Sequence, residues 1–289
     1  MASSVAARPV GGRIGPRRIL ALVALTLVGL VYLFPLYWIV ATAIKGRAEI
    51  FAPEPSLVPK APTIQPFISV LGDRGLLQLL INSVVVCGAT VVCAILLGLL
   101  IAYPLTRLSV SRRLRANVLN WALSLRFLPP IAVVVPYFGL VNFLGLYNSD
   151  LALILVYTLF NLPFALWMLK GFLAEIPLEI EEAALVDGAS RWQAFRRVLL
   201  PLATPGLLAS GIIIFAFSWS EFLFALILTA TPRSQTFPVG VQGLVTQFAI
   251  LWNDMAAAAV IAIAIPLALM FAARRYVISG LTFGVIREK

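Results

Sequence analysis

Histidine is absent from this 289-residue sequence, and cysteine occurs only twice. Without imidazole, histidine-based metal sites and the Ser-His or Cys-His pairs of nucleophilic catalysis are excluded. Cys87 and Cys93 lie in one apolar run, where the helical rise separates them by about 9 Å, too far for a disulfide. We interpret both as small apolar residues of a membrane span.

Nucleotide-binding signatures are also missing. None of the lysines follows a glycine, so the phosphate-binding loop G-x-x-x-x-G-K-[ST] does not occur. If ATP drives this chain, the ATP is therefore bound by a partner subunit, and the chain needs no cofactor of its own. No inverted repeat of the secondary-carrier kind is visible. A basic stripe interleaved with aromatic residues, which would indicate a nucleic-acid partner, is absent as well.

Charge is scarce. Charged residues make up 12% of the chain and hydrophobic residues 61%, with a mean hydropathy of +1.00. Ordinary soluble domains are about 25% charged and about 45–50% apolar. The composition therefore predicts an integral membrane protein, and the net charge of +10 indicates a basic membrane face in contact with lipid headgroups.

Six apolar runs are long enough to cross a bilayer. We expect an all-α protein with a six-helix transmembrane domain over residues 19–273. The first run is much longer than the core of a signal peptide, although Ala41-Thr42-Ala43 resembles a cleavage site. The expected spans are approximately Ile19–Ile44, Gly75–Pro104, Asn117–Phe143, Leu151–Leu173, Pro205–Leu228 and Asp254–Ala273.

Prolines modify these runs. The third contains Pro129, Pro130 and Pro136 and should be kinked, and the fourth should be broken locally at Pro163. Thr204-Pro205 is expected to cap and open the fifth. The outer residues 230–252 have helical apolar spacing at Val241, Leu244, Val245, Phe248, Leu251 and Trp252. This spacing predicts either an interfacial helix or an early start of the last span.

Basic residues predict the orientation. Four fall in each of four segments that lie on one side: the tail 1–18, the second-to-third loop, the interval 170–197 and the tail 274–289. Only five lie in the opposite loops, namely Lys45, Arg47, Lys60, Arg74 and Arg233. The positive-inside rule therefore places both termini in the cytoplasm.

The longest charged interval, residues 175–201, predicts two short helices joined by a turn. Pro177 opens the first helix, and Glu179, Glu181 and Glu182 lie near its positive dipole end. Gly188 provides a left-handed exit. The second helix starts with a capping box, Ser190 and Gln193, carries Arg196 and Arg197 near its end, and is expected to stop at Pro201.

Two ionisable residues are expected at membrane depth, where a charge costs about 2.5–3.5 kcal/mol on insertion scales. Glu221, in the fifth span, either lines a polar pathway and bonds a substrate hydroxyl or a partner subunit, or reaches water at the outer interface. Arg126, in the third span, either reaches the cytoplasmic surface along its alkyl stem or forms an ion pair in the pathway or at a subunit interface.

Other pathway candidates are amides and aromatic residues. Asn82, Asn142 and Asn161 either line the pathway or join helices by hydrogen bonds. Trp219 and Phe222 flank Glu221, and aromatic faces beside polar groups suit stacking on a sugar ring, although aromatic residues are common in spans.

The charged interval also resembles a known motif. Glu182-Ala183-Ala184, followed at fixed spacing by Gly188 and then 198–201 (VLLP), resembles the EAA loop, EAA-x3-G-x9-I-x-LP, of ABC-importer permeases. Only the isoleucine position departs, with Val198. Further similarity to the carbohydrate, maltose-permease branch lies in Asp187-Gly188-Ala189-Ser190 and in the segments 163–177 (PFALWMLKGFLAEIP), 218–222 (SWSEF) and 274–285 (RRYVISGLTFGV).

The resemblance implies the type I ABC-importer permease fold in a bacterial or archaeal inner membrane. It implies a non-enzymatic subunit that pairs with a second permease, two cytoplasmic ATPases and an extracytoplasmic solute-binding protein. The substrate would be a sugar or polyol; a sugar phosphate or another solute, an ATP-independent secondary carrier and a structural scaffold remain as alternatives. The EAA residues expected to couple to the ATPase are Glu182, Ala183, Ala184, Asp187, Gly188, Ser190 and Arg191.

Overall fold

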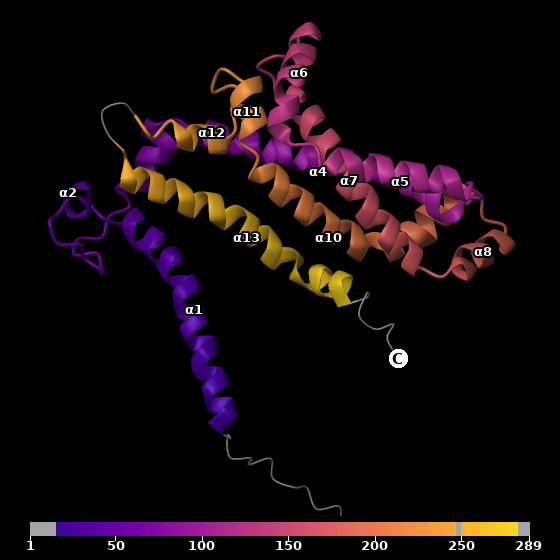
Figure 1. Cartoon of the computed structure of the whole chain (residues 1–289), viewed down its shortest axis with the longest axis horizontal. Coiled ribbons are helices and arrows are strands. Elements are labelled where there is room, and N and C mark those ends of the chain that lie inside the picture. Colours follow the sequence, from indigo (N-terminus) through magenta and orange to yellow (C-terminus); the bar gives the residue numbers. More distant parts are fainter. Residues whose placement is uncertain (1–15, 247–249, 283–289) are drawn as a thin grey trace, which may run out of the picture.

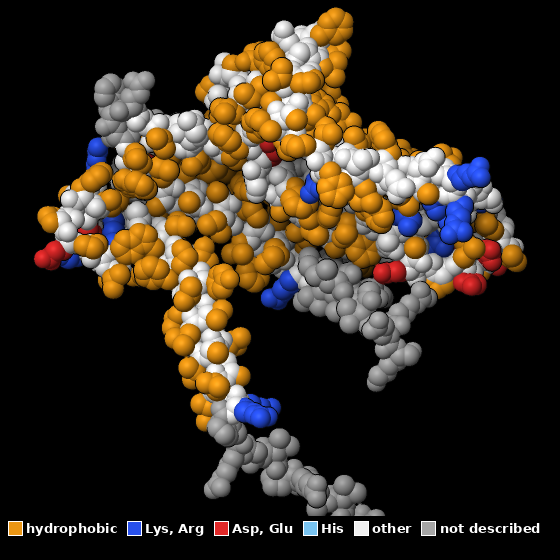
Figure 2. Space-filling view, viewed as in Figure 1, with side chains coloured by type: hydrophobic (Ala, Val, Ile, Leu, Met, Phe, Trp, Pro, Cys, Tyr) orange, Lys and Arg blue, Asp and Glu red, His pale blue; other side chains and the backbone are white. Residues whose placement is uncertain are grey.

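The computed structural model describes residues 16–246 and 250–282, which form helices joined by turns and irregular loops, with one isolated bridge between Val245 and Ile250. Four long helices lie side by side: α4 (Leu76–Arg107), α7 (Asp150–Glu175), α10 (Leu200–Trp219) and α13 (Trp252–Thr282) (Figure 1). The surface in view is largely hydrophobic (Figure 2). This exposure of apolar side chains fits a bundle that meets lipid.

Helix α1 (Pro16–Ala43) stands away from the bundle (Figure 1). Its most apolar 18 residues include none that is buried, and it meets α13 at its C-terminal end, where Ile39 and Ala43 lie in one hydrophobic core with Ala257. The predicted first span is therefore confirmed as a helix, and it starts at Pro16, inside the predicted tail 1–18. The other predicted tail is also shorter, because α13 continues to Thr282. Residues 1–15 and 283–289 of these tails lie outside the described residues.

Small residues allow the central helices to approach closely. Gly206 of α10 faces the ring of Phe172 on α7, where an added Cβ would lie 2.3 Å from the ring carbon Cγ. One hydrophobic core, which includes Ala165, Leu169 and Ala203, joins α4, α7 and α10, with α5 packed beside α7. These contacts form the scaffold that positions the polar residues described below.

The third span differs from the prediction. Instead of one kinked helix over Asn117–Phe143, the chain forms α5 (Arg112–Arg126), capped by Ser111, and α6 (Pro130–Phe143), which meet at 98°. The break falls at the consecutive prolines 129 and 130, because each lacks an N–H and disfavours helix in the residue before it. Within residues 16–246 and 250–282, five helices are individually long and apolar enough to span, and this broken pair would make a sixth.

The predictions for the fourth and fifth spans also need correction. Helix α7 continues through Pro163, which is buried against neighbouring helices; packing and local adjustments satisfy the freed backbone group inside a bundle. The start of the fifth span also differs from the prediction, because the second helix of the charged interval does not stop at Pro201. Short α9 (Arg191–Ala194) continues through a π-helical segment, η2 (Phe195–Leu199), into α10, with Pro201 in its first turn. Thr204 is thus inside α10, where its hydroxyl donates to the Leu200 carbonyl.

The remaining short helices lie at the end of the bundle opposite α8 (Leu178–Val186). They are α2 (Arg47–Ile50), α3 (Gln65–Ile68), the π-helical η1 (Ser69–Asp73), α11 (Leu223–Leu228) and α12 (Phe237–Gln242). Neither alternative for residues 230–252 is correct as stated. A helix is present but ends at Gln242, and α13 begins at Trp252, two residues before the predicted start; Phe248 lies outside the described residues.

Candidate coupling loop and translocation surface

The charged interval folds as predicted around its turn. Helix α8 follows Pro177 and ends at Val186, and Gly188 has φ +88°, the left-handed conformation that favours glycine. The Ala189 N–H donates to the Ala184 carbonyl at 3.0 Å, which closes the turn. Ser190 and Gln193 form the reciprocal capping box, at 3.3 and 2.7 Å. Local hydrogen bonds therefore fix the geometry of the whole loop.

Helix α8 lies at one extreme of the molecule (Figure 1), where charged side chains gather (Figure 2). Val186 is 87% exposed and Trp192 65% exposed, which is unusual for apolar side chains at a polar tip. Ala184 is half-buried. The other predicted coupling residues are exposed: Glu182, Ala183, Asp187, Gly188, Ser190 and Arg191. The loop thus presents a mixed surface of charged and apolar side chains that the described residues do not cover.

One acidic residue of α8 points the other way. Glu181 is 4% exposed, accepts a hydrogen bond from the Tyr103 hydroxyl at 2.7 Å and lies 3.5 Å from the Nε of Arg107. Tyr103 and Arg107 belong to α4 and were not among the predicted site residues. Neighbouring residues of a helix point to different sides, so the sequence could have indicated that Glu181 and Glu182 are not both exposed.

Glu221 lies between two helices and not within a continuous fifth span, because α10 ends at Trp219 and α11 begins at Leu223. Both carboxylate oxygens accept from the Phe224 N–H at 3.1 Å, and one also accepts from Ala225 at 3.4 Å. The first backbone N–H groups of a helix have no carbonyl partner within that helix, and the Glu221 carboxylate supplies the missing acceptor for α11. Glu221 is therefore a cap of α11, and its role in a pathway stays a prediction.

The residues that flank Glu221 point in different directions. Trp219 is 6% exposed, stacks on Phe215 and donates from its indole nitrogen to the Ala262 carbonyl of α13 at 3.0 Å. Phe222 packs, half-buried, into the hydrophobic core that includes Tyr157. The structure therefore does not bring these two rings together into one stacking surface.

The predicted amides join separate segments. The Asn82 side chain donates to the carbonyls of Pro232, Arg233 and Gln235 at 2.9–3.1 Å, linking α4 to the loop before α12. Asn161 of α7 donates to the Tyr157 carbonyl and to the Ser218 hydroxyl of α10, while its buried Oδ1 has no hydrogen-bond partner in the described part of the chain. Asn161 therefore joins two helices and keeps one free acceptor, whereas Asn82 joins a helix to a loop.

Arg126 ends α5 at the broken span. Its guanidinium carbon lies 4.7 Å from the ring centroid of Phe217 and 5.8 Å from that of Phe164, so it rests on two aromatic faces of α10 and α7. The residue is exposed, and it forms no ion pair within residues 16–246 and 250–282. An uncompensated cation therefore lies on the face where three helices meet.

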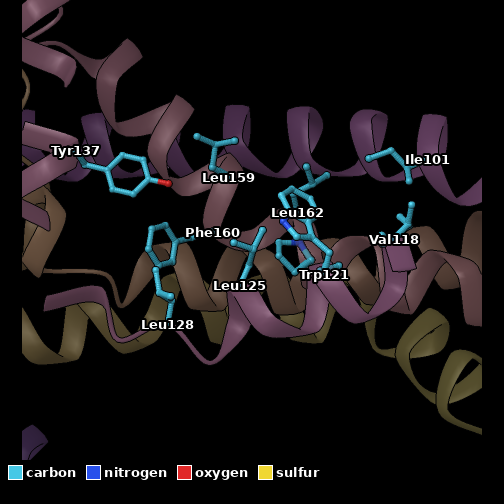
Figure 3. Close-up of a pocket in the computed structure, with 12 residues that line it drawn as sticks. Ile101, Val118, Trp121, Leu125, Leu128, Tyr137, Leu159, Phe160 and Leu162 are labelled. Atoms are coloured by element: carbon cyan, nitrogen blue, oxygen red, sulfur yellow. The ribbon is translucent and has the colours of Figure 1, made fainter. Parts of the chain in front are cut away.

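A pocket of about 240 Å³ lies nearby, between α4, α5, α6 and α7. Tyr137 stands at one end of it, Trp121 and Leu162 near the middle, and Val118 and Ile101 at the other end (Figure 3). Its side chains are aliphatic and aromatic, with the Tyr137 hydroxyl and Trp121 indole as the polar groups. This lining does not match a hydroxyl-rich solute, which needs several hydrogen-bonding partners.

Comparisons with known proteins agree with this architecture. Residues 94–282 match the model of the family described as binding-protein-dependent transport system inner membrane component. The sulfoquinovosyl glycerol transport system permease protein SmoH of Agrobacterium fabrum is 36% identical over 256 residues, covering 88% of this chain and 89% of that protein. The trehalose/maltose transport system permease protein MalG of Thermococcus litoralis is 31% identical over 282 residues, covering 94% and 97%.

A solved structure shares the fold. The crystal structure of a bacterial ABC transporter involved in the import of the acidic polysaccharide alginate matches with a TM-score of 0.74, covering 93% of this chain and 99% of the matched chain at 19% identity. Together with the helical bundle and its apolar spans, these matches identify a multi-pass membrane protein. The chain belongs to the family of binding-protein-dependent transport system inner membrane components, the permeases of ABC transport systems.

Proposed function

We propose that this chain is a permease subunit of an ATP-driven importer for a sugar or polyol. Relatives named for sulfoquinovosyl glycerol, trehalose and maltose transport support the substrate class. In this proposal the chain pairs with a different permease to enclose the pathway. Two cytoplasmic ATPases bind the ATP, and an extracytoplasmic solute-binding protein delivers the solute.

The proposed topology has six spans, with α5 and α6 counted as one broken span, and both termini in the cytoplasm. The distribution of basic residues supports it, because the end of the bundle that carries α8 also carries Arg112, Arg113, Arg115, Arg196 and Arg197. Residues 1–18 and 274–289 would then belong to the cytoplasmic side.

The single observation that carries the coupling role is the exposed surface of α8 and its turn, whose geometry is held by local hydrogen bonds. Glu182 would pair with a basic group on the ATPase, and the exposed methyl of Ala183 beside half-buried Ala184 would allow close approach. Asp187, Ser190 and Arg191 would border the docking surface, and Gly188 would keep the turn. ATP-driven closure of the ATPases then moves α8, and the permeases open outward because the two states differ in this contact.

Gly188→Pro tests this role in the complex purified with its neighbouring-gene subunits. Proline requires φ near −65°, which is incompatible with φ +88°, so we expect binding-protein-stimulated ATP hydrolysis to be lost. Gly188→Asn is the matched control, because asparagine tolerates the left-handed conformation, and it should retain hydrolysis. Equal stimulation in the proline variant, or transport by this chain alone as in a secondary carrier, would refute the proposal.

For the pathway we propose Glu221, Asn161, Asn82, Trp219 and Phe222, of which Glu221 and Asn161 have the stronger support. Glu221 is half-buried beside the helix break, and Asn161 has an unused acceptor. Glu221→Gln keeps a capping oxygen but removes the charge, whereas Glu221→Ala removes both. Uptake that is unaltered in both variants would exclude a pathway role for the carboxylate.

A second candidate substrate class is an acidic sugar derivative, such as a sugar phosphate. Arg126 is the observation that favours it, because an exposed guanidinium on two aromatic rings has a free charge for an anionic substituent. Arg126→Gln should then reduce uptake of an acidic solute while Arg126→Lys retains most of it. Loss of the partner permease from the purified Arg126→Gln complex would instead indicate an ion pair between the subunits.

A further inference from the structure

A buried polar cluster joins α8 to the end of α4. Its members are Tyr103, Arg107 and Glu181, and we call it the α4–α8 latch. The Arg107 and Glu181 side chains are only 5% and 4% exposed, and Arg107 Nε lies 3.5 Å from Glu181 Oε2. Tyr103 donates to the other carboxylate oxygen at 2.7 Å. Charges this deeply buried are stable only when paired, so separating α8 from α4 would leave an uncompensated charge.

Arg107 also holds the end of α7. Its Nη2 donates to the carbonyls of Leu173 and Ile176 at 2.6 and 2.7 Å. The last carbonyls of a helix lack partners within the helix, and here the guanidinium supplies them. One side chain of α4 thus binds both the end of α7 and the helix that follows it.

The latch is a specific link between α8 and the transmembrane helices. Apart from this cluster, α8 packs mainly against α9 and η2, the segments that follow it in sequence. At its opposite end, α4 is bonded through Asn82 to the carbonyls of residues 232–235 and through the Ser83 hydroxyl to the Phe237 N–H. A single helix therefore has polar attachments to α8 at one end and to the loop around α12 at the other.

We propose that the latch makes α8 and α4 move as one rigid body, so that displacement of α8 reaches the opposite end of the bundle. Glu181, Arg107 and Tyr103 are then positioning residues for coupling, distinct from the exposed residues that would touch the ATPase. This inference rests on the proposed function, in which ATP-driven closure of the ATPases moves α8.

Distance measurements between spin labels test the rigid body directly. The labels are placed at Leu178→Cys, at the exposed start of α8, and Leu77→Cys, at the exposed opposite end of α4, with Cys87 and Cys93 replaced by alanine. In the assembled complex we expect the same distance distribution without nucleotide and with ATP plus vanadate. With Glu181→Gln or Arg107→Gln, the distribution should shift and broaden on nucleotide addition while the ATPase subunits stay bound and hydrolyse ATP.

A milder variant and a control complete the test. Tyr103→Phe removes one hydrogen bond and should loosen the distribution less. Glu179→Gln removes an exposed carboxylate of the same helix and should behave as wild type. The double variant of Arg107 and Glu181 should be no worse than Arg107→Gln alone, because the pair is already broken in that variant and Arg107 carries the additional bonds to the end of α7.

Two results would overturn the latch. One is a wild-type distance that changes with nucleotide; the other is a Glu181→Gln distance that stays as constant as that of wild type. Dissociation of the ATPases from Glu181→Gln, with an unchanged distance in Tyr103→Phe, would show a purely structural role and overturn it too. Failure of the proposed function has a separate signature, since no ATPase would then co-purify with the wild-type chain.

Discussion

At the scale of single residues, the same side-chain type has different tasks. Asn82 and Asn161 were indistinguishable as lone amides in apolar runs, yet Asn82 donates to three loop carbonyls while Asn161 joins two helices. Their partners are distant in sequence, so only the fold could identify them. Glu221 likewise gains a capping role because α10 ends just before it.

Asn82→Ala is expected to destabilise the protein by about 1–3 kcal/mol, because it removes three part-buried hydrogen bonds from the buried Asn82 side chain to loop carbonyls. Thermal unfolding in detergent measures the effect as a lower midpoint. Asn120→Ala is the control, because Asn120 is exposed on α5. Equal midpoints for the two variants would contradict the structural role of Asn82.

Glu49 makes the stability of the outer loop over residues 47–60 depend on pH. Hydrogen bonds donated by the Ser56 hydroxyl and by the backbone N–H of Lys60 lower the pKa of the Glu49 carboxyl below its ordinary value. A lowered folded-state pKa stabilises the loop at pH above about 4.3, the unfolded value, and this stabilisation is lost as pH falls through the folded pKa. The protection of residues 47–60 against hydrogen exchange, measured relative to the intrinsic exchange rate at each pH, should therefore fall in acid, and Glu49→Gln should abolish that pH dependence.

At the scale of elements, prolines mark where a helix is weak but not whether it breaks. Pro163 lies inside α7, Pro201 lies in the first turn of α10, and only the consecutive prolines 129 and 130 divide a span. Packing decides between these outcomes, since a buried helix keeps its neighbours across a missing hydrogen bond. The proline pattern alone therefore predicted a break at Pro163 that is absent and placed the start of the fifth span too late.

Close packing of α7 and α10 predicts that Gly206→Ala is destabilising. The new Cβ would lie 2.3–2.7 Å from three carbons of the Phe172 ring, so the ring must move in a packed bundle. We expect a loss of about 1–3 kcal/mol, measured by unfolding in detergent. Gly171→Ala is the control, because nothing lies within 4 Å of its added Cβ; an equal effect of both changes would refute the packing argument.

At the scale of the whole molecule, the composition predicted a helical membrane protein, and the motif predicted the family; both are confirmed. The turn at Gly188 and the capping box at Ser190 were predictable because local bonds form them. The bond between Glu181 and Tyr103 was not, because it joins residues 78 apart in sequence. The substrate surface was least predictable, since its candidates serve other structural roles within this chain.

The proposed orientation makes a prediction for the entire chain. Single cysteines introduced by Ser190→Cys and Arg233→Cys, both at exposed positions, should react from opposite sides of the membrane. A membrane-impermeant maleimide added to intact spheroplasts should label only the second, and both should react after permeabilisation. Labelling of Ser190→Cys from outside would reverse the topology.

Helix α4 has 32 residues and is therefore about 48 Å long, whereas the hydrocarbon layer is about 30 Å thick. Moderate tilt cannot hide this excess, so both ends of the helix reach the two headgroup regions. Asn82 and Arg107, bonded near these ends, then experience any thinning or thickening of the lipid layer. We therefore expect the thickness of the host membrane, which its lipid composition sets, to affect the position and tilt of α4, because hydrophobic mismatch acts on the helix that bears both attachments.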